Sequence, residues 1–316
     1  MVDVSERKID SLGADTNARP TVSIGMPVRN GESFIEEALQ SLLDQTFDDF
    51  ELIISDNASE DRTSMICEHY ARRDRRIRYS RLQTNVGAAP NFNQVFRLAR
   101  GRFFKWAFHD DTYLPDYLIR CVQVFQSSPP NVVVVYPRTE LIDEKNRSLG
   151  FDPLSLSIEE RMPHRRLTYF IKNIHWSNPI FGLIRSESLR KTRLHDSFIS
   201  SDYVLLAELL LLGEFREVPE VLFRRRFHPN RATEANPSPG ALRRWFNPSK
   251  RIGPLDLLPI GLRLQLEYVR SVYRIPIGYS DKFKCLAAIA KTGVTQEIRN
   301  IGGLYKRRIK NWLIQT

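Results

Sequence analysis

Apolar positions in the first 140 residues of this 316-residue chain follow two alternating patterns. Runs rich in β-branched and aromatic residues occupy 21–28, 50–55 and 131–136, and each ends at a polar or proline-containing turn, as strands do. Between these runs apolar residues recur every three or four positions, which is the spacing of an amphipathic helix. The run 131–136 is apolar on both faces, which is typical of a strand inside a covered, mostly parallel sheet. The pattern therefore predicts an α/β domain of repeated strand–helix units.

The rest of the chain shows the same two patterns more weakly. Ser59 or Asp61 is the expected N-cap of a helix at 61–73. Residues 229–256 mix Pro, Gly, Asn and Ser, so we expect a loop there, whereas 256–316 is basic and helical in pattern. We expect further strands at 77–80, 102–108, 180–185 and 215–227, and further helices at 34–43, 90–99, 115–126, 156–174 and 202–212.

Composition places the chain among soluble globular proteins, since 42% of its residues are hydrophobic and 27% are charged. Cys67, Cys121 and Cys285 are far apart and lack metal-ligand spacing, which argues against a disulfide scaffold or a zinc site and favours a reducing compartment. Residues 1–20 are polar, so we expect no signal peptide. The most apolar run, 204–212, is about half of the roughly 20 residues that span a bilayer. These features predict a cytoplasmic protein.

Charge leaves several classes of partner open. The formal net charge is +10, and 36 of the 47 basic residues are arginine, whose planar fork suits phosphate. Phosphorylated small molecules, nucleic acid and anionic membranes are all compatible with this balance, as is a general compositional preference for arginine. Nucleic acid ranks last, because we find no module in which basic and aromatic residues interleave.

Polar clusters follow three of the predicted strands, at 27–31, 56–61 and 109–111. The carboxyl ends of parallel strands share one edge of a sheet, so these clusters are expected to lie along that edge, although each one alone is also compatible with a capping loop. In the third cluster, Asp110 and Asp111 repel each other unless a cation or hydrogen-bond donors compensate. Carboxylate oxygens suit a hard divalent ion. The alternative is that both residues cap a helix that begins near Pro115.

Three long segments carry a specific resemblance: PVRNGESFIEEALQSLLDQTF, FELIISDNASEDRT and NVGAAPNFNQVFRLARGRFFKWAFHDD. Together they resemble the family 2 glycosyltransferases, which have the GT-A fold with a mostly parallel central sheet flanked by helices. The resemblance is continuous over about 20–135, and a weaker one reaches about 228 through SDYVLLAELLLLGEF and VLFRRRFH. It implies inverting transfer of a sugar from a nucleotide-diphospho-sugar to a hydroxyl acceptor.

The resemblance also implies which residues hold the donor nucleotide. A carboxylate such as Asp56 can accept a hydrogen bond from a base N–H or a ribose hydroxyl. Residues 88–91 lack the basic residue that the family often carries there, which leaves the phosphate partner unassigned. The implied nucleotide-binding residues are Pro27, Val28, Arg29, Asn30, Asp56, Asn85, Gly87 and Asp110.

A DXD-type motif maps onto 109–111, and it implies that Asp111 is a ligand of Mn²⁺ or Mg²⁺. Such an ion acts as a Lewis acid on the diphosphate leaving group. His228, at the end of VLFRRRFH, is a candidate second metal ligand or diphosphate contact, and the alternative is an ordinary surface histidine. The run 224–226 equally suits a diphosphate.

Asp202 matches the family's catalytic base by position, and the alternative is that it only N-caps the helix that follows. Glu208, more than a turn further along, is the second candidate base. Trp176 is a candidate acceptor-binding platform, since an exposed indole stacks on a sugar face, or else a core residue.

These assignments divide the chain into three parts. Residues 1–19 form a tail, 20–230 a GT-A domain with a donor-binding half at 20–135 and an acceptor half at 136–230, and 231–316 a basic loop and helical C-terminal extension. The alternative function is that of a catalytically inactive relative that binds a nucleotide-sugar or a glycan. A nucleotidyltransferase or a dinucleotide-binding dehydrogenase is disfavoured, because no glycine-rich phosphate loop follows a strand.

The acceptor is expected to be a saccharide or a lipid-linked molecule of cell-envelope polysaccharide or glycolipid synthesis. Residues 298–314 place apolar side chains near one face of a helix and basic ones mostly elsewhere, which is typical of a helix that lies on an anionic membrane, although a packing helix has the same pattern. We hypothesise a peripheral contact with the inner face of the membrane through this helix.

Overall fold

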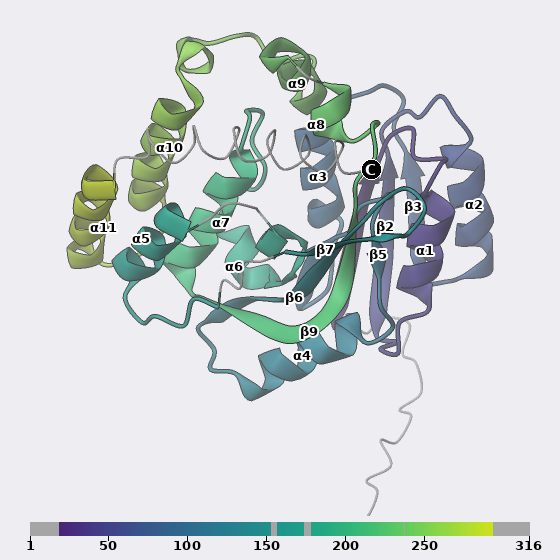
Figure 1. Cartoon of the computed structure of the whole chain (residues 1–316), viewed down its shortest axis with the longest axis horizontal. Helices are drawn as coiled ribbons and strands as arrows, with labels where there is room; N and C mark the ends of the chain where they lie inside the picture. Colours follow the sequence, from purple (N-terminus) through teal and green to yellow (C-terminus); the bar gives the residue numbers. More distant parts are fainter. Residues whose placement is uncertain (1–18, 153–156, 174–177, 237, 293–316) are drawn as a thin grey trace, which may run out of the picture.

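The computed structural model describes residues 19–152, 157–173, 178–236 and 238–292 (Figure 1). Its strands are β1 (Val22–Val28), β2 (Phe50–Asp56), β3 (Ile77–Arg81), β4 (Phe103–Trp106), β5 (Thr112–Tyr113), β6 (Val132–Ile142), β7 (Ser148–Phe151), β8 (Leu183–Arg185) and β9 (Glu214–Arg226). They form one sheet in the order β3-β2-β1-β4-β8-β6-β9-β5, and β7 pairs with β6 outside this path. The pairs among β1–β4 and the pair β6–β9 are parallel, whereas β5, β7 and β8 run antiparallel to their neighbours. The sheet is therefore mostly parallel, as the sequence predicts.

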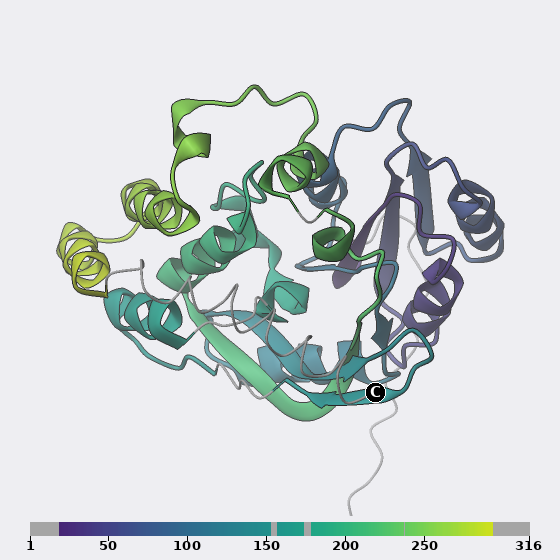
Figure 2. The ribbon, with the colours of Figure 1, turned by 45° about the horizontal axis from the view of Figure 1, so that its top comes forward.

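The helices lie on both sides of this sheet. They are α1 (Ile35–Leu43), α2 (Thr63–Arg73), α3 (Ala88–Arg97), α4 (Tyr117–Ser127), α5 (Pro163–Asn173), α6 (Ser186–Arg190), α7 (Ser201–Leu212), α8 (Ala232–Ala235), α9 (Pro239–Phe246), α10 (Ile260–Arg274) and α11 (Tyr279–Thr292), with 3₁₀ turns η1 (Asn178–Phe181) and η2 (Pro254–Leu257). In Figures 1 and 2, α1 and α2 cover one side of β1–β3 and α3 covers the other. This double cover explains why every residue of β1 and β2 is buried.

Helix α7 explains the most apolar run of the sequence. Its residues from Val204 to Leu211 are all buried, including Glu208, so the helix is apolar on every side and lies inside the protein. No helix in the described part of the chain is both long and apolar enough to cross a bilayer.

Most predicted elements are confirmed, and the differences have local causes. The expected strand at 180–185 begins as η1, and only Leu183–Arg185 pairs with the sheet. The prediction of a loop at 229–256 is wrong in part, because this segment contains α8, α9 and η2. Ser238 caps α9 by accepting a hydrogen bond from the Ala241 amide. The N-cap of α2 is Arg62 rather than Ser59 or Asp61, although Asp61 Oδ1 accepts from the Thr63 amide at 3.0 Å.

The C-terminal extension is attached to the acceptor half through a buried ionic cluster. Arg193 donates to Glu208 of α7 at 2.8 Å and to Glu267 of α10 at 2.5 Å. Ser271 of α10 also donates to Glu208, at 3.0 Å. Both glutamates are buried, so these contacts join α10 to α7 within the core.

Candidate active site

The loops that follow β1 and β2 are joined by hydrogen bonds. The Asn30 amide donates to Ser59 Oγ at 3.0 Å, and the Glu60 amide donates to Asn30 Oδ1 at 2.9 Å. Asn30 and Ala58 have φ angles of +53° and +56°, a left-handed conformation that is uncommon for residues other than glycine. Such a conformation persists where the surrounding contacts determine it, so this pair of loops is held in one arrangement.

The residues predicted to hold the nucleoside occupy this edge of the sheet. Pro27 and Val28 end β1 in register with the end of β2, where Asp56 lies. Both of their side chains are buried, which leaves backbone groups to contact a ligand. Arg29 is exposed beside them and forms an ion pair with Glu60 at 2.9 Å.

Asp56 is fully buried and already has partners within the protein. Its Oδ1 accepts from the Ser59 amide at 2.8 Å, and its Oδ2 accepts from Tyr79 Oη at 3.0 Å. Arg81 lies 3.7 Å from Oδ2. Burial and the Asp56 charge raise the pKa of Tyr79, so the phenol stays protonated as a donor. Sequence reasoning missed Tyr79 and Arg81, although both belong to the strand that pairs with the end of β2.

Asn85 and Gly87 are attached to the same edge through Asn57. The Asn57 side chain donates to Asn85 Oδ1 at 2.9 Å, and its Oδ1 accepts from the Val86 amide at 2.9 Å. Gly87 has a φ of +88°, and a Cβ there would lie 2.6 Å from the carbonyl oxygen of Phe246. The segment after α9 therefore covers this loop, which only a glycine allows.

The cluster at 109–111 follows β4 and touches the loop after β1. A Cβ added to Gly31 would lie 2.7 Å from Cδ2 of His109, so the two loops are in close contact. Three clusters that are far apart in sequence thus meet at one edge, as predicted.

Asp110 and Asp111 take different partners. Asp110 Oδ2 lies 3.0 Å from Nε2 of His228, and Asp111 Oδ1 accepts from the Arg226 amide at 2.9 Å. Burial alone would raise the pKa of Asp110, but His109 and His228 hold it well below its usual range. Burial and the Asp110 charge raise the pKa of Asp111 to about 7. The interpretation of both residues as caps of the next helix is wrong, because α4 begins only at Tyr117, after β5.

Arg226 binds the segments around this pair together, and its side chain is fully buried. It donates to the Asp110 carbonyl at 2.8 Å, to the Asn146 side chain at 2.7 Å and to Glu37 of α1 at 2.8 Å. Its guanidinium also lies 4.8 Å from the centre of the Phe34 ring. Arg226 therefore holds the Asp110 backbone and is not available to a diphosphate, which corrects one interpretation of the arginine run.

A comparison of the sequence with protein-family models identifies the family of this chain. The family model described as glycosyl transferase family 2 matches residues 23–194, which is more than half of the chain. The chain belongs to glycosyl transferase family 2. It is 30% identical over 217 residues to an uncharacterized glycosyltransferase of Rickettsia typhi, covering 68% of this chain and 66% of that protein.

A second relative matches a shorter stretch of the chain at higher identity. A putative teichuronic acid biosynthesis glycosyltransferase, TuaG of Bacillus subtilis, is 37% identical over 103 residues, which are 33% of this chain and 41% of the relative. The chain spans about a third to two thirds of the length of the first curated relatives that it matches.

Solved structures show the GT-A fold. Staphylococcus aureus TarS in complex with UDP-GlcNAc superposes with a TM-score of 0.63 at 16% identity, covering 87% of this chain and 73% of that one. The mannosyltransferase PcManGT from Pyrobaculum calidifontis, in complex with GDP-Man and Mn²⁺, superposes with a TM-score of 0.51 at 17% identity, covering 97% and 86%. The expected fold class is thereby confirmed, with α10 and α11 as C-terminal helices.

On the acceptor side of this family 2 chain, Asp202 lies in the first turn of α7, one residue inside a helix that begins at Ser201. Tyr268 of α10 is buried, and this burial raises its pKa. The charges of Tyr203 and Asp202 raise the pKa of Tyr268 further. The second candidate base, Glu208, is excluded because it is fully buried and bonded to Arg193 and Ser271. Trp176 lies outside the described residues, as does the helix predicted at 298–314.

One carboxylate of this edge fits a divalent ion. In the ranges that the structure describes, no group of three or more His, Cys, Asp or Glu side chains could enclose a metal. Among the described residues, Asp111 accepts a hydrogen bond through Oδ1, and burial beside the Asp110 charge raises its pKa. Such a group suits an ion that takes its other ligands from phosphate and water. His228 is buried rather than on the surface, and its Nε2 is occupied by Asp110.

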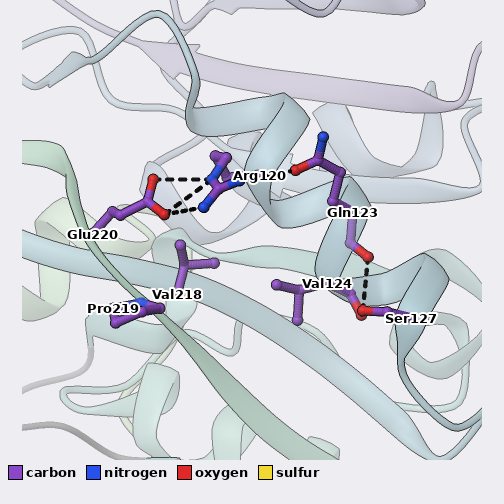
Figure 3. Close-up of a pocket in the computed structure, with 7 residues that line it drawn as sticks. All are labelled: Arg120, Gln123, Val124, Ser127, Val218, Pro219 and Glu220. Carbon is purple, nitrogen blue, oxygen red and sulfur yellow. Dashed lines mark hydrogen bonds and ion pairs between the residues drawn. The ribbon is translucent and has the colours of Figure 1, made fainter. Parts of the chain in front are cut away.

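A separate surface pocket opens between α4 and β9 (Figure 3). It contains none of the predicted site residues, and an ion pair between Arg120 and Glu220 crosses it. Its lining residues are Arg120, Gln123, Val124, Ser127, Val218, Pro219 and Glu220. We assign it no role.

Proposed function

We propose that this protein is an inverting glycosyltransferase that moves a sugar from a nucleotide-diphospho-sugar to a hydroxyl acceptor. The observation that carries the proposal is the meeting of Asp110 and Asp111 with the loops after β1 and β2, where His109 contacts Gly31. This arrangement puts a pair of carboxylates beside the carboxyl ends of β1 and β2, the edge where ligands bind in sheets of this kind. Family membership and the nucleotide-sugars in the TarS and PcManGT structures support the same donor class.

Asp111 would hold Mn²⁺ or Mg²⁺, and Asp110 would face the ribose or the sugar. When bound, the ion supplies a Lewis acid for the diphosphate leaving group. The Arg226 side chain donates a hydrogen bond to the Asp110 carbonyl, and the Arg226 amide donates one to the Asp111 carboxylate. Both carboxylates would therefore be positioned before the nucleotide-sugar binds. His228 would contact the diphosphate or the ion after release from Asp110, or through Nδ1.

Arg29, Asn30 and the backbone of Pro27 and Val28 would border the nucleoside, and Asp56 would hold it from the end of β2. Because both oxygens of Asp56 already accept hydrogen bonds, a base or ribose donor would use a remaining lone pair. The loop with Asn85 and Gly87 would close the other side of the donor site.

Asp202 would act as the general base. In an inverting reaction one in-line displacement occurs, and the base removes the proton of the acceptor hydroxyl while the oxygen bonds to the anomeric carbon. Asp202 stands in the first turn of α7, where the positive end of the helix dipole favours a negative charge. Trp176 is proposed as an acceptor contact on sequence grounds alone.

The acceptor would belong to cell-envelope polysaccharide or glycolipid synthesis on the cytoplasmic side of the membrane. The name of TuaG, a putative teichuronic acid biosynthesis glycosyltransferase, supports the polysaccharide class. A peripheral contact through 298–314 would bring the site near a lipid-linked acceptor.

Calorimetry with a panel of UDP-, GDP- and dTDP-sugars, with and without Mn²⁺, tests the donor site. We expect one nucleotide-sugar to bind in a Mn²⁺-dependent way to the wild type and at least about tenfold more weakly to Asp111→Asn, as loss of a charged ligand contact implies. Asp48→Asn is the matched control, because the side chain of Asp48 is 92% exposed. Equal binding by wild type and Asp111→Asn would remove Asp111 from the site.

Turnover distinguishes the enzyme from an inactive relative that only binds. With the selected donor, NMR of the product should show an inverted anomeric configuration. Asp202→Asn should retain donor affinity and lose at least about 10²-fold in turnover, the usual contribution of a general base. Donor binding without transfer or hydrolysis in the wild type would favour the inactive relative, and full activity of Asp202→Asn would reject this base.

A further inference from the structure

Large apolar side chains that face solvent are concentrated in the C-terminal extension. Elsewhere in the described chain such residues lie on separate elements: Met65, Leu98, Phe151, Met162 and Tyr169. Isolated cases of this kind are ordinary, whereas a group on consecutive elements marks an interaction surface. The group in the extension comprises Ile252, Leu257, Ile260, Leu262, Leu266, Tyr273, Tyr279 and Phe283, which are between 37% and 91% exposed.

Helical spacing places five of these side chains on one stripe of each of two helices. On α10, Leu262, Leu266 and Tyr273 are separated by four and seven residues and so lie along one stripe. The opposite stripe is buried, and α10 packs there against α7. On α11, Tyr279 and Phe283 are also four residues apart and exposed, while Cys285 and Ile289 are buried. Each helix therefore has a second apolar face that the described residues leave uncovered.

Exposed charge on the same segment is mostly positive. Of its acids, Glu267 is buried in the cluster with Arg193, whereas Asp256 and Asp281 are half-buried, and the Asp256 carboxylate lies 3.5 Å from Arg263. The bases that reach solvent are Arg244, Lys250, Arg251, Arg270, Arg274, Lys284 and Lys291. Solvent therefore meets an apolar surface bordered by cations.

We propose that this surface, which we name the extension face (the exposed apolar residues and bases of 251–284), docks on an anionic lipid bilayer. Leucine, isoleucine and phenylalanine side chains would enter the acyl boundary, the tyrosine rings would lie at headgroup level, and the bases would attract the lipid charge. In Figures 1 and 2, α10 and α11 lie at the end of the molecule remote from α1 and α2, so a flat surface can reach them.

Charge favours a membrane over a second copy of the chain as the occupant. A two-fold dimer would place the same basic patch against itself, and like charges across an interface oppose association. Anionic lipid supplies the complementary charge. The extension face is distinct from residues 298–314, and its docking is independent of sugar transfer.

The test is co-sedimentation of the full chain with vesicles of phosphatidylcholine alone, or of phosphatidylcholine and phosphatidylglycerol in equal parts. We expect binding to the anionic vesicles only, and weaker binding at high salt. Leu262→Ser combined with Leu266→Ser should lower the bound fraction, and Arg251→Glu combined with Lys284→Glu should lower the partition coefficient at least about tenfold.

Matched controls come from the opposite end of the molecule. Met65→Ser, and Arg72→Glu combined with Arg73→Glu, alter exposed residues of α2 and should leave vesicle binding unchanged. Thermal unfolding and donor binding verify that each variant is folded. The proposal is overturned if the wild type stays in the supernatant with anionic vesicles, or if both face variants bind as the wild type does. It is also overturned if gel filtration shows a dimer that Leu262→Ser with Leu266→Ser dissociates, since the occupant is then a second copy.

Discussion

Arg226 is the residue on which the arrangement of the candidate site depends. One buried side chain contacts α1, the Asp110 backbone and the β6–β7 hairpin, and its own amide donates to Asp111. The carbonyls it satisfies lie in a water-poor environment, where a missing donor costs more than the bond itself contributes. The position of the paired carboxylates is thus set by a residue that no substrate is expected to touch.

Arg226→Met keeps most of the side-chain volume and removes every donor of the guanidinium. We expect it to lower the free energy of unfolding by about 3–5 kcal/mol, because several buried acceptors each lose their donor, and to weaken donor binding. Urea denaturation measures the first effect and calorimetry the second. Arg224→Met is the control on the same strand, because Arg224 is 45% exposed and pairs with Glu140; its cost should stay within about 1 kcal/mol. Equal costs for the two variants would contradict the role given to Arg226.

Asp111 makes the stability of the metal-free protein depend on pH. Its pKa in the folded chain is about 7, above the ordinary aspartate value of about 4, so between these values the folded chain keeps a proton that the unfolded chain has lost. Stability from this group is therefore present below about pH 4 and is lost as the pH rises toward 7. The free energy of unfolding of the wild type should fall relative to Asp111→Asn across this window, by up to roughly 4 kcal/mol.

Urea denaturation of both proteins at several pH values, with a chelator present, measures this difference. Mn²⁺ together with the donor should reverse the trend, since a metal ligand must be deprotonated and binding then releases a proton. A difference between the two proteins that does not change with pH would show that Asp111 is charged throughout.

At the scale of elements, the loop before α3 and the segment after α9 are in backbone contact. Gly87 lies against Phe246 and Asn247, and Asn247 in turn donates to Ser197, in the segment that leads to α7. The loop that carries Asn85 is thus packed against the C-terminal extension. A movement of α9 would therefore displace the loop of Asn85 and Gly87, which belongs to the predicted nucleotide site.

Two glycines separate the cost of this contact from the cost of backbone conformation. Gly150 has a φ of +102° but open space around its Cβ position, whereas Gly87 has a φ of +88° and backbone atoms at 2.6 and 2.7 Å. Gly150→Ala should cost roughly 1–2 kcal/mol from its left-handed conformation alone. Gly87→Ala should cost about 1–3 kcal/mol more, and should weaken donor binding. Thermal and urea unfolding of both variants measure the difference. Equal losses in the free energy of unfolding would mean that residues 246–248 move away from the added Cβ without cost.

Elements were largely predictable because their signals are local. Strand β6 begins with the unbroken apolar run 132–136, and α7 carries a long apolar stretch, while β1 and β2 are mostly apolar and fully buried. Helix α9 was missed because Pro239 and Gly240 occupy its first turn within a segment rich in Pro and Asn, although Leu242, Trp245 and Phe246 have helical spacing.

The site was predictable only in part. The clusters after β1, β2 and β4 could be placed on one edge from strand order alone. The roles of Arg226, Tyr79 and Arg81 could not, because each depends on a partner across the sheet or in a distant segment. An arginine in a basic run also gives no sign that it is buried. Asp202 and Trp176 retain roles that rest on the resemblance.

At the scale of the whole molecule, the C-terminal extension is part of the core that carries the predicted base. Glu267 of α10 pairs with Arg193 and lies 3.0 Å from Arg270, and Arg193 continues to Glu208 of α7. Helix α10 therefore supports the helix that begins next to Asp202. The boundary predicted at residue 230 divides the chain by sequence pattern rather than by packing.

Glu267→Gln tests this dependence. It leaves the buried Arg193 with one carboxylate instead of two, and we expect a loss of about 3–5 kcal/mol in the free energy of unfolding. Hydrogen exchange should show faster opening of α7, the helix to which α10 is bonded. Glu187→Gln removes an exposed pair with Lys191 on α6 and should change neither quantity. Unchanged exchange in α7 for Glu267→Gln would show that the extension does not support it.

The contacts of Arg226 also set the moment in synthesis at which the two carboxylates of the candidate site can first be ordered. Asp110 emerges from the ribosome 116 residues before Arg226, an interval of roughly 6–23 s at ordinary translation rates. During that time every residue of the predicted nucleotide site already exists, but the strand that orders the two carboxylates does not. A chain interrupted before β9 would therefore lack the strand that orders the two carboxylates, and that strand ends only when about seven tenths of the sequence has been made.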